Sequence, residues 1–429
     1  MALNLEQHPC FNDAARHKFG RVHLPVAPRC NIKCRFCNRK FDCVNESRPG
    51  VSSGILTPRQ AMAYLDEVMK RKGNISVVGI AGPGDPFANP DESMETLRLV
   101  RKKYPDMLLC VATNGLNVGP YLDELKELDV SHVTITVNAV DPEVGEKIYS
   151  WVRSGKHVYH VKSGFKMLME KQFAAVKGLK ERGITTKINT IIIPGINDRH
   201  VEAVSQKMAE LGADLQNCVA YYPNEGSDFE NMAEPSPAMM KTVRETAQKY
   251  MPLMHHCTRC RADAVGLLGE TPDMGLMKTL QACEQMTDFE ESSDKPSPDV
   301  NRPHVAVATL EGVLVNQHLG QAQRLAIYGK KDGSIHLLET RETPVEGTGA
   351  NRWAAMAQIL SDCGTLLVSG IGETPKMLLS EYGLQIFEVE GLIDEALDAF
   401  FSGKGLAHMK KHDIGPCTGG RGKNVVGCC

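Results

Sequence analysis

Three cysteines lie close together near the start of the chain. Cys30, Cys34 and Cys37 follow the pattern Cys-x3-Cys-x2-Cys. Three thiolates bind only three irons of a 4Fe–4S cube and leave the fourth iron open to a small molecule, whereas a structural cluster normally has a fourth cysteine. Structural zinc sites use four ligands, usually in two separated pairs. The spacing therefore favours a cluster that does chemistry, with a zinc site or a chance grouping as the alternatives.

The same pattern resembles that of the radical S-adenosylmethionine (radical SAM) family. The resemblance implies that the open iron chelates the amino and carboxylate groups of SAM. One electron from the cluster then cleaves a C–S bond and yields a 5′-deoxyadenosyl radical. Phe36, directly before the third cysteine, is in a position to cover one face of the cluster.

Composition limits the other possibilities. The chain has 429 residues, too many for one ordinary domain, and its net charge of −3 suggests no nucleic acid partner. The sequence opens without a basic stretch followed by an apolar run, and no apolar segment reaches the length of about eighteen residues that predicts a membrane helix. We expect a cytoplasmic protein with no membrane span, in which the 14 cysteines bind metal rather than form disulfides.

Apolar runs alternate with amphipathic stretches as far as residue 283. The pattern predicts strands at residues 22–27, 75–81, 107–112, 132–137, 185–193 and 214–222, and helices at 58–71, 94–103, 121–128, 173–182, 200–211 and 237–249. Six βα units predict an α/β fold whose parallel sheet curls into a partial (βα)6 barrel. Functional loops should lie at the carboxyl ends of its strands.

Small and polar residues follow the predicted strands. The first strand leads into the cysteine loop, and the next four are followed by the runs 82–86 (GPGDP), 113–115 (TNG), Asn138 and 194–198 (PGIND). Glycine, proline and asparagine are common turn formers, so any single loop has a simple structural explanation. Their recurrence at one rim, behind a cluster loop, favours a ligand site.

The sequence predicts four segments. Residues 1–285 form the barrel with cluster-ligand segments at both ends, and residues 286–303 form an acidic, proline-rich linker. Residues 304–412 form a small α/β domain, with strands near 305–309, 312–315, 325–328, 335–339, 365–369 and 385–388 and helices near 352–361, 374 and 393–401. Residues 413–429, rich in glycine and cysteine, form a flexible tail.

Further cysteines lie outside the first motif. Cys10 and Cys43 flank the first strand and its loop, Cys110 is on the third strand, and Cys257 and Cys260 form a tight pair. A lone cysteine on a strand is most often a small core residue, and a Cys-x2-Cys pair suits zinc, redox chemistry or a cluster. Their expected convergence at the barrel rim favours additional clusters. His23, on the first strand, offers an imidazole that can replace a thiolate on iron.

Several longer motifs resemble the NifB family of nitrogenase cofactor biosynthesis proteins. They are the runs 8–10 (HPC), 26–40 (VAPRCNIKCRFCNRK), 43–50 (CVNESRPG), 81–86 (AGPGDP), 113–116 (TNGL), 133–138 (VTITVN) and 257–270 (CTRCRADAVGLLGE). Together they span residues 8 to 270 and are very specific. The second domain resembles, less specifically, the NifX and NafY type of cofactor-binding domain, which has an RNase H-like fold, through the run 316–320 (NQHLG).

The resemblance implies a radical SAM enzyme with three 4Fe–4S clusters. One binds SAM, and the other two are fused into an eight-iron, carbide-containing precursor called NifB-co, with a SAM methyl group as the carbon source. Carried over by motif, the SAM cluster ligands are Cys30, Cys34 and Cys37. The six further ligands are His23, Cys43 and Cys110 for one precursor cluster and Cys10, Cys257 and Cys260 for the other, a division that stays open.

The resemblance also assigns roles to other residues. Glu46 and Arg48 are candidates for proton handling near the clusters, with a salt-bridged loop as the alternative. The expected SAM-binding residues are Gly82, Gly84, Asp85, Asn114, Asn138 and Ile196. His318 is a candidate ligand for a bound cluster or a simple surface residue. Expected partners are SAM, iron–sulfur donor and carrier proteins of nitrogenase assembly, and an electron donor such as a ferredoxin.

Two other functions remain open from the residues. The chain could be a radical SAM enzyme acting on another substrate class, such as a nucleotide or a peptide, which would not need three clusters. It could instead be a non-enzymatic iron–sulfur scaffold or carrier, which would not consume SAM. Detection of 5′-deoxyadenosine together with S-adenosylhomocysteine separates the three.

Overall fold

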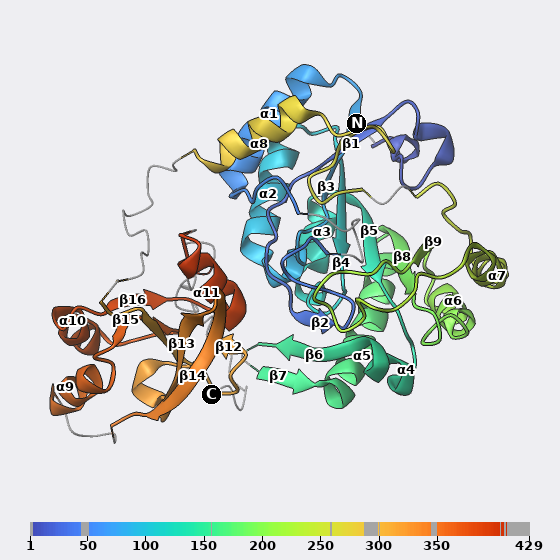
Figure 1. The fold of residues 1–429 in the computed structure, drawn as a ribbon. Helices are drawn as coiled ribbons and strands as arrows, with labels where there is room; N and C mark the ends of the chain where they lie inside the picture. The colour runs from blue at the N-terminus through green and yellow to red at the C-terminus, as the bar shows by residue number, and fades with distance from the viewer. Residues whose placement is uncertain are drawn as a thin grey trace, which may run out of the picture. The chain divides into compact units, whose positions relative to one another are not determined.

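The computed structural model describes residues 3–43, 51–155, 157–257, 260–286, 299, 301–344, 350–403, 405–406 and 409. The chain forms two compact units, Met1–Asp288 and Phe289–Cys429 (Figure 1). The predicted linker falls largely outside the described residues, and the predicted tail wholly so. The domain boundaries drawn from the sequence therefore stay predictions.

The first unit is built on a seven-stranded sheet with the order β10-β1-β3-β4-β5-β8-β9. Six strands are parallel and follow chain order, as the alternating pattern predicts. They are β1 (Gly20–His23), β3 (Ile75–Ile80), β4 (Leu108–Thr113), β5 (Val130–Thr136), β8 (Thr185–Ile192) and β9 (Leu215–Ala220). The short β10 (Val265–Gly266) pairs antiparallel with β1 at one edge. The sheet curls into a half-barrel, so the predicted fold class is confirmed (Figure 1).

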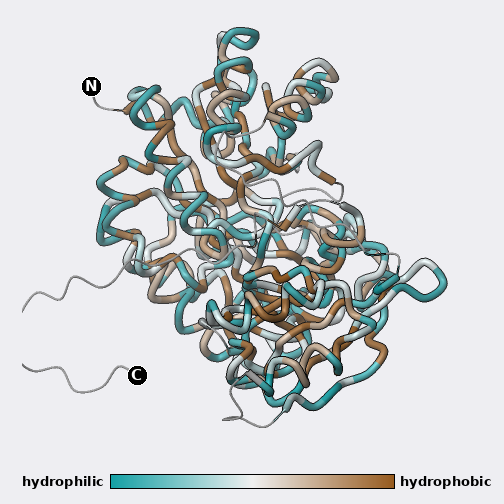
Figure 2. Tube along the Cα trace, turned by 90° about the vertical axis from the view of Figure 1, so that its left-hand side faces the viewer, coloured by the Kyte–Doolittle hydropathy of each residue, from teal (hydrophilic) through white to brown (hydrophobic). Residues whose placement is uncertain are grey.

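Helices connect these strands. They are α1 (Pro58–Arg71), α2 (Pro90–Lys103), α3 (Leu122–Glu127), α5 (Val161–Glu181), α6 (Val201–Glu210) and α7 (Pro237–Ala247), followed by α8 (Met274–Glu284), which packs on α1. Helix α1 begins with a capping box in which Thr57 and Gln60 bond each other's backbone N–H groups, so its start is legible in the sequence. The main core lies between sheet and helices, and hydrophobic stretches of the trace gather toward the interior (Figure 2).

A small second sheet of three strands is absent from the sequence prediction. It has the order β2-β6-β7, from β2 (Ile32–Cys34), β6 (Tyr149–Ser154) and β7 (His157–His160). Strands β6 and β7 follow the unpredicted helix α4 (Pro142–Ile148). Strand β2 is part of the cysteine loop, and its pairing with β6 joins segments more than a hundred residues apart. Three polar-flanked residues carry no strand signal alone, so only the pairing makes them a strand.

The second unit has a five-stranded sheet of order β14-β13-β11-β15-β16. Its elements are β11 (His304–Ala308), β13 (Arg324–Lys331), β14 (Ser334–Glu342), α9 (Ala350–Ile359), β15 (Cys363–Val368), α10 (Glu373–Glu381), β16 (Gln385–Glu388) and α11 (Ile393–Phe401), with β12 (Leu314–Val315) paired to β17 (Gly391–Leu392). Two apolar clusters build its core. None of the helices formed by the described residues has the length and apolar character that crossing a membrane requires.

Candidate active site

The three motif cysteines lie in a loop held by backbone contacts. Cys34 and Cys37 are buried and Cys30 is half-buried. The N–H of Cys37 donates to the carbonyl of Cys34 at 3.0 Å, and Lys33 Nζ donates to the carbonyl of Cys37 at 2.9 Å. Burial raises the pKa of the Cys30 thiol to about 12, so metal binding there must release a proton. Phe36 is fully buried in the apolar cluster that contains Cys34 and Cys37.

Asn114 and Asp85 adjoin this loop from the ends of β4 and β3. Asn114 Nδ2 donates to Asn31 Oδ1 at 2.6 Å and lies 3.8 Å from Cys30 Sγ. Asp85 is buried, and its carboxylate accepts bonds from Thr113 Oγ1 at 2.9 Å and from the Asn114 N–H at 2.7 Å. Burial raises the pKa of Asp85 despite these donors. Asn114 therefore lies beside a predicted cluster ligand, whereas Asp85 ties two strand-end loops together.

Two glycines let the loop after β3 approach the cysteine loop. A Cβ on Gly84 would lie 2.2 Å from the carbonyl oxygen of Arg29, and the Gly84 N–H donates to the carbonyl of Ala27 at 2.6 Å. Gly82 has a φ of +133°, which side-chain-bearing residues rarely adopt. These contacts explain the glycines by packing of protein backbone. Their predicted approach to the SAM amino group stays a prediction.

Asn138 and Ile196 adjoin the apolar cluster that contains Cys34 and Cys37. Asn138 Oδ1 accepts from the Ile191 N–H at 2.9 Å, and its Nδ2 donates to the Tyr149 hydroxyl at 3.2 Å. Ile196 packs, partly buried, on the apolar cluster that includes the motif cysteines. Both residues thus shape the surroundings of the cysteine loop. Their predicted contact with SAM stays a prediction.

A cavity separate from the cysteine loop lies inside the curl of the sheet. Its space is about 750 Å³ with the open solvent at its mouth included, and every parallel strand contributes residues to its lining. Five of the six predicted precursor-cluster ligands line it: Cys10, His23, Cys110, Cys257 and Cys260. They come from the N-terminal segment, β1, β4 and the loop before β10. The fold thus gathers residues that are up to 250 positions apart in the sequence.

The sixth predicted ligand lies elsewhere among the described residues. The Cys43 N–H donates to the carbonyl of Pro83 at 2.8 Å, and Cys43 does not line the cavity. Glu46 and Arg48 lie outside the described residues. Across the part of the chain that is described, no three His, Cys, Asp or Glu side chains are close enough to hold a single metal ion. A four-iron cube separates its ligands more widely than a single ion does.

The hydrogen bond of His23 fixes which ring nitrogen is available. His23 Nδ1 lies 3.1 Å from the carbonyl oxygen of Arg261 and so carries the proton that it donates. Burial lowers the pKa of His23 to about 4, which keeps the ring neutral and leaves the Nε2 lone pair for a metal. Soft thiolates and a neutral imidazole are donors that suit iron–sulfur clusters. The residues present therefore fit the implied groups.

The sulfurs of the other set influence one another. Burial raises the pKa of Cys10 to about 11, and the nearby thiols of Cys260 and Cys257 add to the rise. Sequence reasoning missed two cations in the same lining, Arg21 and Lys187, as well as the buried His8. The available signal was an arginine and a lysine within otherwise buried strands, β1 and β8.

Comparisons with known proteins show which families share these features. A model of the radical SAM superfamily matches residues 24–208, and a dinitrogenase iron-molybdenum cofactor model matches residues 302–403. The protein called FeMo cofactor biosynthesis protein NifB from Chlorobaculum tepidum is 51% identical, with 100% of both chains covered. Its namesake from Klebsiella pneumoniae is 37% identical over 88% of this chain and 86% of its own. Methylornithine synthase (PylB) is a solved structure at 15% identity and a TM-score of 0.38, covering 62% of this chain and 80% of its own.

The two NifB relatives cover 100% and 88% of this chain, at identities that show shared family. The superfamily match makes the first unit a radical SAM domain, a class that binds a 4Fe–4S cluster and SAM. The second match makes the other unit a NifX-like domain. With a cysteine loop and a thiol-lined cavity in one half-barrel, the chain belongs to the NifB family of FeMo-cofactor biosynthesis proteins.

Proposed function

We propose that this radical SAM enzyme of nitrogenase cofactor biosynthesis fuses two 4Fe–4S clusters into an eight-iron, carbide-containing product, NifB-co. The two clusters are its substrates, and the carbon comes from a SAM methyl group. The observation that carries the proposal is the cavity inside the half-barrel, which gathers four cysteines and His23 from four separate segments. A radical SAM enzyme acting on an organic substrate would have no need of such a set.

The cysteine loop and the cavity have separate tasks. The cluster at Cys30, Cys34 and Cys37 supplies the electron that cleaves SAM to the 5′-deoxyadenosyl radical. Asn114, 3.8 Å from Cys30 Sγ, is in a position to orient SAM at that rim. In the cavity, a sulfide of a substrate cluster is a soft nucleophile that accepts a methyl group from one SAM. The methyl transfer leaves S-adenosylhomocysteine. The radical from a second SAM abstracts one hydrogen atom from that methyl group and becomes 5′-deoxyadenosine. The other two hydrogens leave as protons, the new carbon–sulfur bond breaks, and the electrons of the resulting carbide come from the irons and the electron donor.

The ligands divide into two sets. Cys10, Cys257 and Cys260 hold one substrate cluster, which the mutual influence of their thiols on the Cys10 pKa supports. His23 and Cys110 hold the other, together with Cys43. The Arg261 carbonyl orients His23 for this role by fixing its tautomer.

The second unit retains or delivers the product. His318 is exposed, and its Nδ1 accepts from the Gly320 N–H at 3.0 Å, which places the ring proton on Nε2, where it can donate a hydrogen bond to a sulfur of a bound cluster. All nine ligands precede residue 285, so the chemistry belongs to residues 1–285. A ferredoxin-like electron donor and the donor and carrier proteins of nitrogenase assembly complete the cycle.

Anaerobic reconstitution with iron analysis and SAM product analysis tests this function. The expected result is about twelve irons per chain, from three four-iron clusters, and the formation of both 5′-deoxyadenosine and S-adenosylhomocysteine. Saturation near four irons, with 5′-deoxyadenosine alone, would show a radical SAM enzyme of another substrate class. Bound clusters without either SAM product would show a scaffold or carrier.

A further inference from the structure

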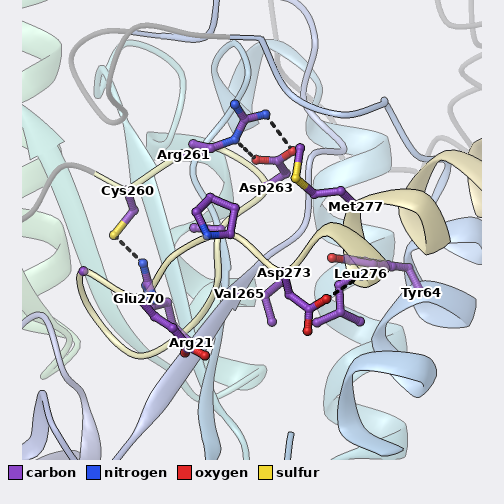
Figure 3. Close-up of a pocket in the computed structure, with 13 residues that line it drawn as sticks. Arg21, Tyr64, Cys260, Arg261, Asp263, Val265, Glu270, Asp273, Leu276 and Met277 are labelled. Atoms are coloured by element: carbon purple, nitrogen blue, oxygen red, sulfur yellow. Dashed lines mark hydrogen bonds and ion pairs between the residues drawn. The ribbon is translucent and has the colours of Figure 1, made fainter. Parts of the chain in front are cut away.

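Arg21 lies between the cavity and a second, outer pocket. The outer pocket encloses about 590 Å³, counted to its opening, and is lined in part by Tyr64, Glu270 and Met277 (Figure 3). Arg21 and Cys260 belong to the linings of both hollows. Although it borders two hollows, Arg21 is only 4% exposed. Its guanidinium is therefore a largely desolvated charge directly behind a predicted cluster ligand.

The contacts of Arg21 aim this charge at sulfur. Its Nη1 donates to the carbonyl oxygens of Gly266 and Leu267, which fixes the plane of the guanidinium. Its Nη2 donates to Cys260 Sγ at 2.9 Å, as Figure 3 shows. Within the described residues, Nε is buried and has no hydrogen-bond partner.

No carboxylate within the described residues forms an ion pair with Arg21. The nearby Glu270 is engaged by Lys72, whose Nζ lies 2.6 Å from Glu270 Oε1. Arg261, in the same view, shows the usual arrangement, with its Nε 2.7 Å from Asp263 Oδ1 (Figure 3). Burying a charge without a counter-ion is costly, and proteins normally pair such groups. Glu270 feels the charge of Arg21 only as the weakest of the influences that lower its pKa, and it is bonded to Lys72, so an anion on the sulfur side would complete the charge balance of Arg21.

We propose that Arg21 is a positioning residue for the substrate cluster bound by Cys260, where it orients the thiolate and balances the negative charge of the thiolate-ligated cluster. This inference rests on the proposed function. Lys187 places a second cation in the same lining, which contains no Asp or Glu among the described residues. Hydrogen bonds and positive charge near a cluster sulfur favour the reduced cluster, so Arg21 raises its reduction potential.

The full-length protein with Arg21 replaced by Met, Arg21→Met, tests this role. After anaerobic reconstitution, we expect either loss of about four irons per chain or, where the cluster is retained, a shift of its midpoint potential to more negative values in EPR-monitored titration. Arg21→Lys keeps the charge and should restore occupancy and most of the potential. Lys72→Met is the control, because it removes a cation that pairs with Glu270 of the outer pocket and, among the described residues, makes no hydrogen bond to Cys260.

The outcomes separate the inference from the proposed function. If Arg21→Met keeps wild-type iron and potentials and only melts at a lower temperature, the residue is structural and the inference fails. If Arg21→Met does not fold, the Arg21→Lys variant decides the question. A folded Arg21→Lys protein that lacks the cluster would overturn the inference that Arg21 acts by balancing the charge of the cluster. Wild-type saturation near four irons would instead overturn the proposed function itself.

Discussion

The cysteine loop and the cavity are built in opposite ways. The loop presents three cysteines within eight consecutive residues, and backbone bonds such as the one between Cys37 and Cys34 fix their spacing locally. The cavity takes its thiols from positions as distant as Cys10 and Cys260 and holds them only through the curl of the sheet. A resident cofactor suits ligands that are local and fixed. A cavity assembled from distant segments suits substrates that must enter, react and leave.

The surroundings of the cysteine loop are apolar, whereas those of the cavity are polar and positively charged. The loop cysteines lie in an apolar cluster with Phe36 and Tyr221, which would exclude water from the predicted SAM-binding cluster. The cavity contains Arg21, Lys187 and several polar side chains, and its histidines are held neutral by burial. Positive charge without carboxylates favours an anionic guest. Under the proposed function, this difference lets one half-barrel hold the SAM-binding cluster and process substrate clusters at separate places.

The largest effect on activity is expected from removing the three cysteines of the loop. Replacing Cys30, Cys34 and Cys37 with Ala should abolish SAM cleavage, because the electron source loses all its protein ligands. The cavity keeps its ligands, so the other clusters should remain visible by EPR after anaerobic reconstitution. Loss of every cluster in this variant would show that the two regions depend on each other.

Cavity variants should have a more selective effect. We expect Cys10→Ala, Cys257→Ala or Cys260→Ala to lose about four irons per chain and to make no eight-iron product, while 5′-deoxyadenosine still forms. Cys218→Ala is the matched control, since Cys218 is a buried cysteine on β9 outside the cavity lining. Normal product yield from the three variants would make the Cys257–Cys260 pair structural.

The neutral histidines predict a pH effect on the metal-free protein. The folded pKa of His23 is lowered to about 4, below its usual value of 6.5, so the unfolded chain binds more protons between these limits. Stability is therefore fully present above pH 6.5 and falls as the pH drops toward 4. Between pH 6.5 and 5, urea unfolding should show a loss of at most about 2 kcal/mol from His23.

His23→Asn should reduce this pH dependence, whereas the same change at the exposed His157 should leave it unaltered. A slope that His23→Asn does not change would mean that the other buried histidines, His8 and His132, account for all of it. Burial lowers their pKa values in the same direction.

The smallest effect on SAM chemistry is expected from removing the second unit. A chain truncated after residue 303 should cleave SAM at the wild-type rate, because all nine predicted ligands precede that point. It should release the product faster than the full-length chain does. The rate of release can be measured by mixing the product-loaded protein with an iron-chelating or cofactor-accepting protein. A truncated protein that folds and binds three clusters, yet leaves SAM intact, would refute this division of labour.

The sequence by itself determined what depends on neighbouring residues. The spacing of Cys30, Cys34 and Cys37 predicts the ligands of one cluster, apolar runs predict the six parallel strands, and amphipathic stretches predict the helices between them. The predicted helix at residues 58–71 coincides with α1, Pro58–Arg71, whose start is marked by Pro58 and the Thr57 capping box. These signals are local, so they survive without knowledge of the fold.

Tertiary structure decided what depends on distant pairing. Strand β2 exists only because β6 bonds to it, and α5 begins at Val161 rather than 173. Whether Lys187 faces the cavity or the helices depends on the phase of β8 in the curled sheet. Strand alternation alone does not supply that phase where both faces are buried. The roles of Gly84 and Arg21 rest on backbone atoms that the sequence does not bring together.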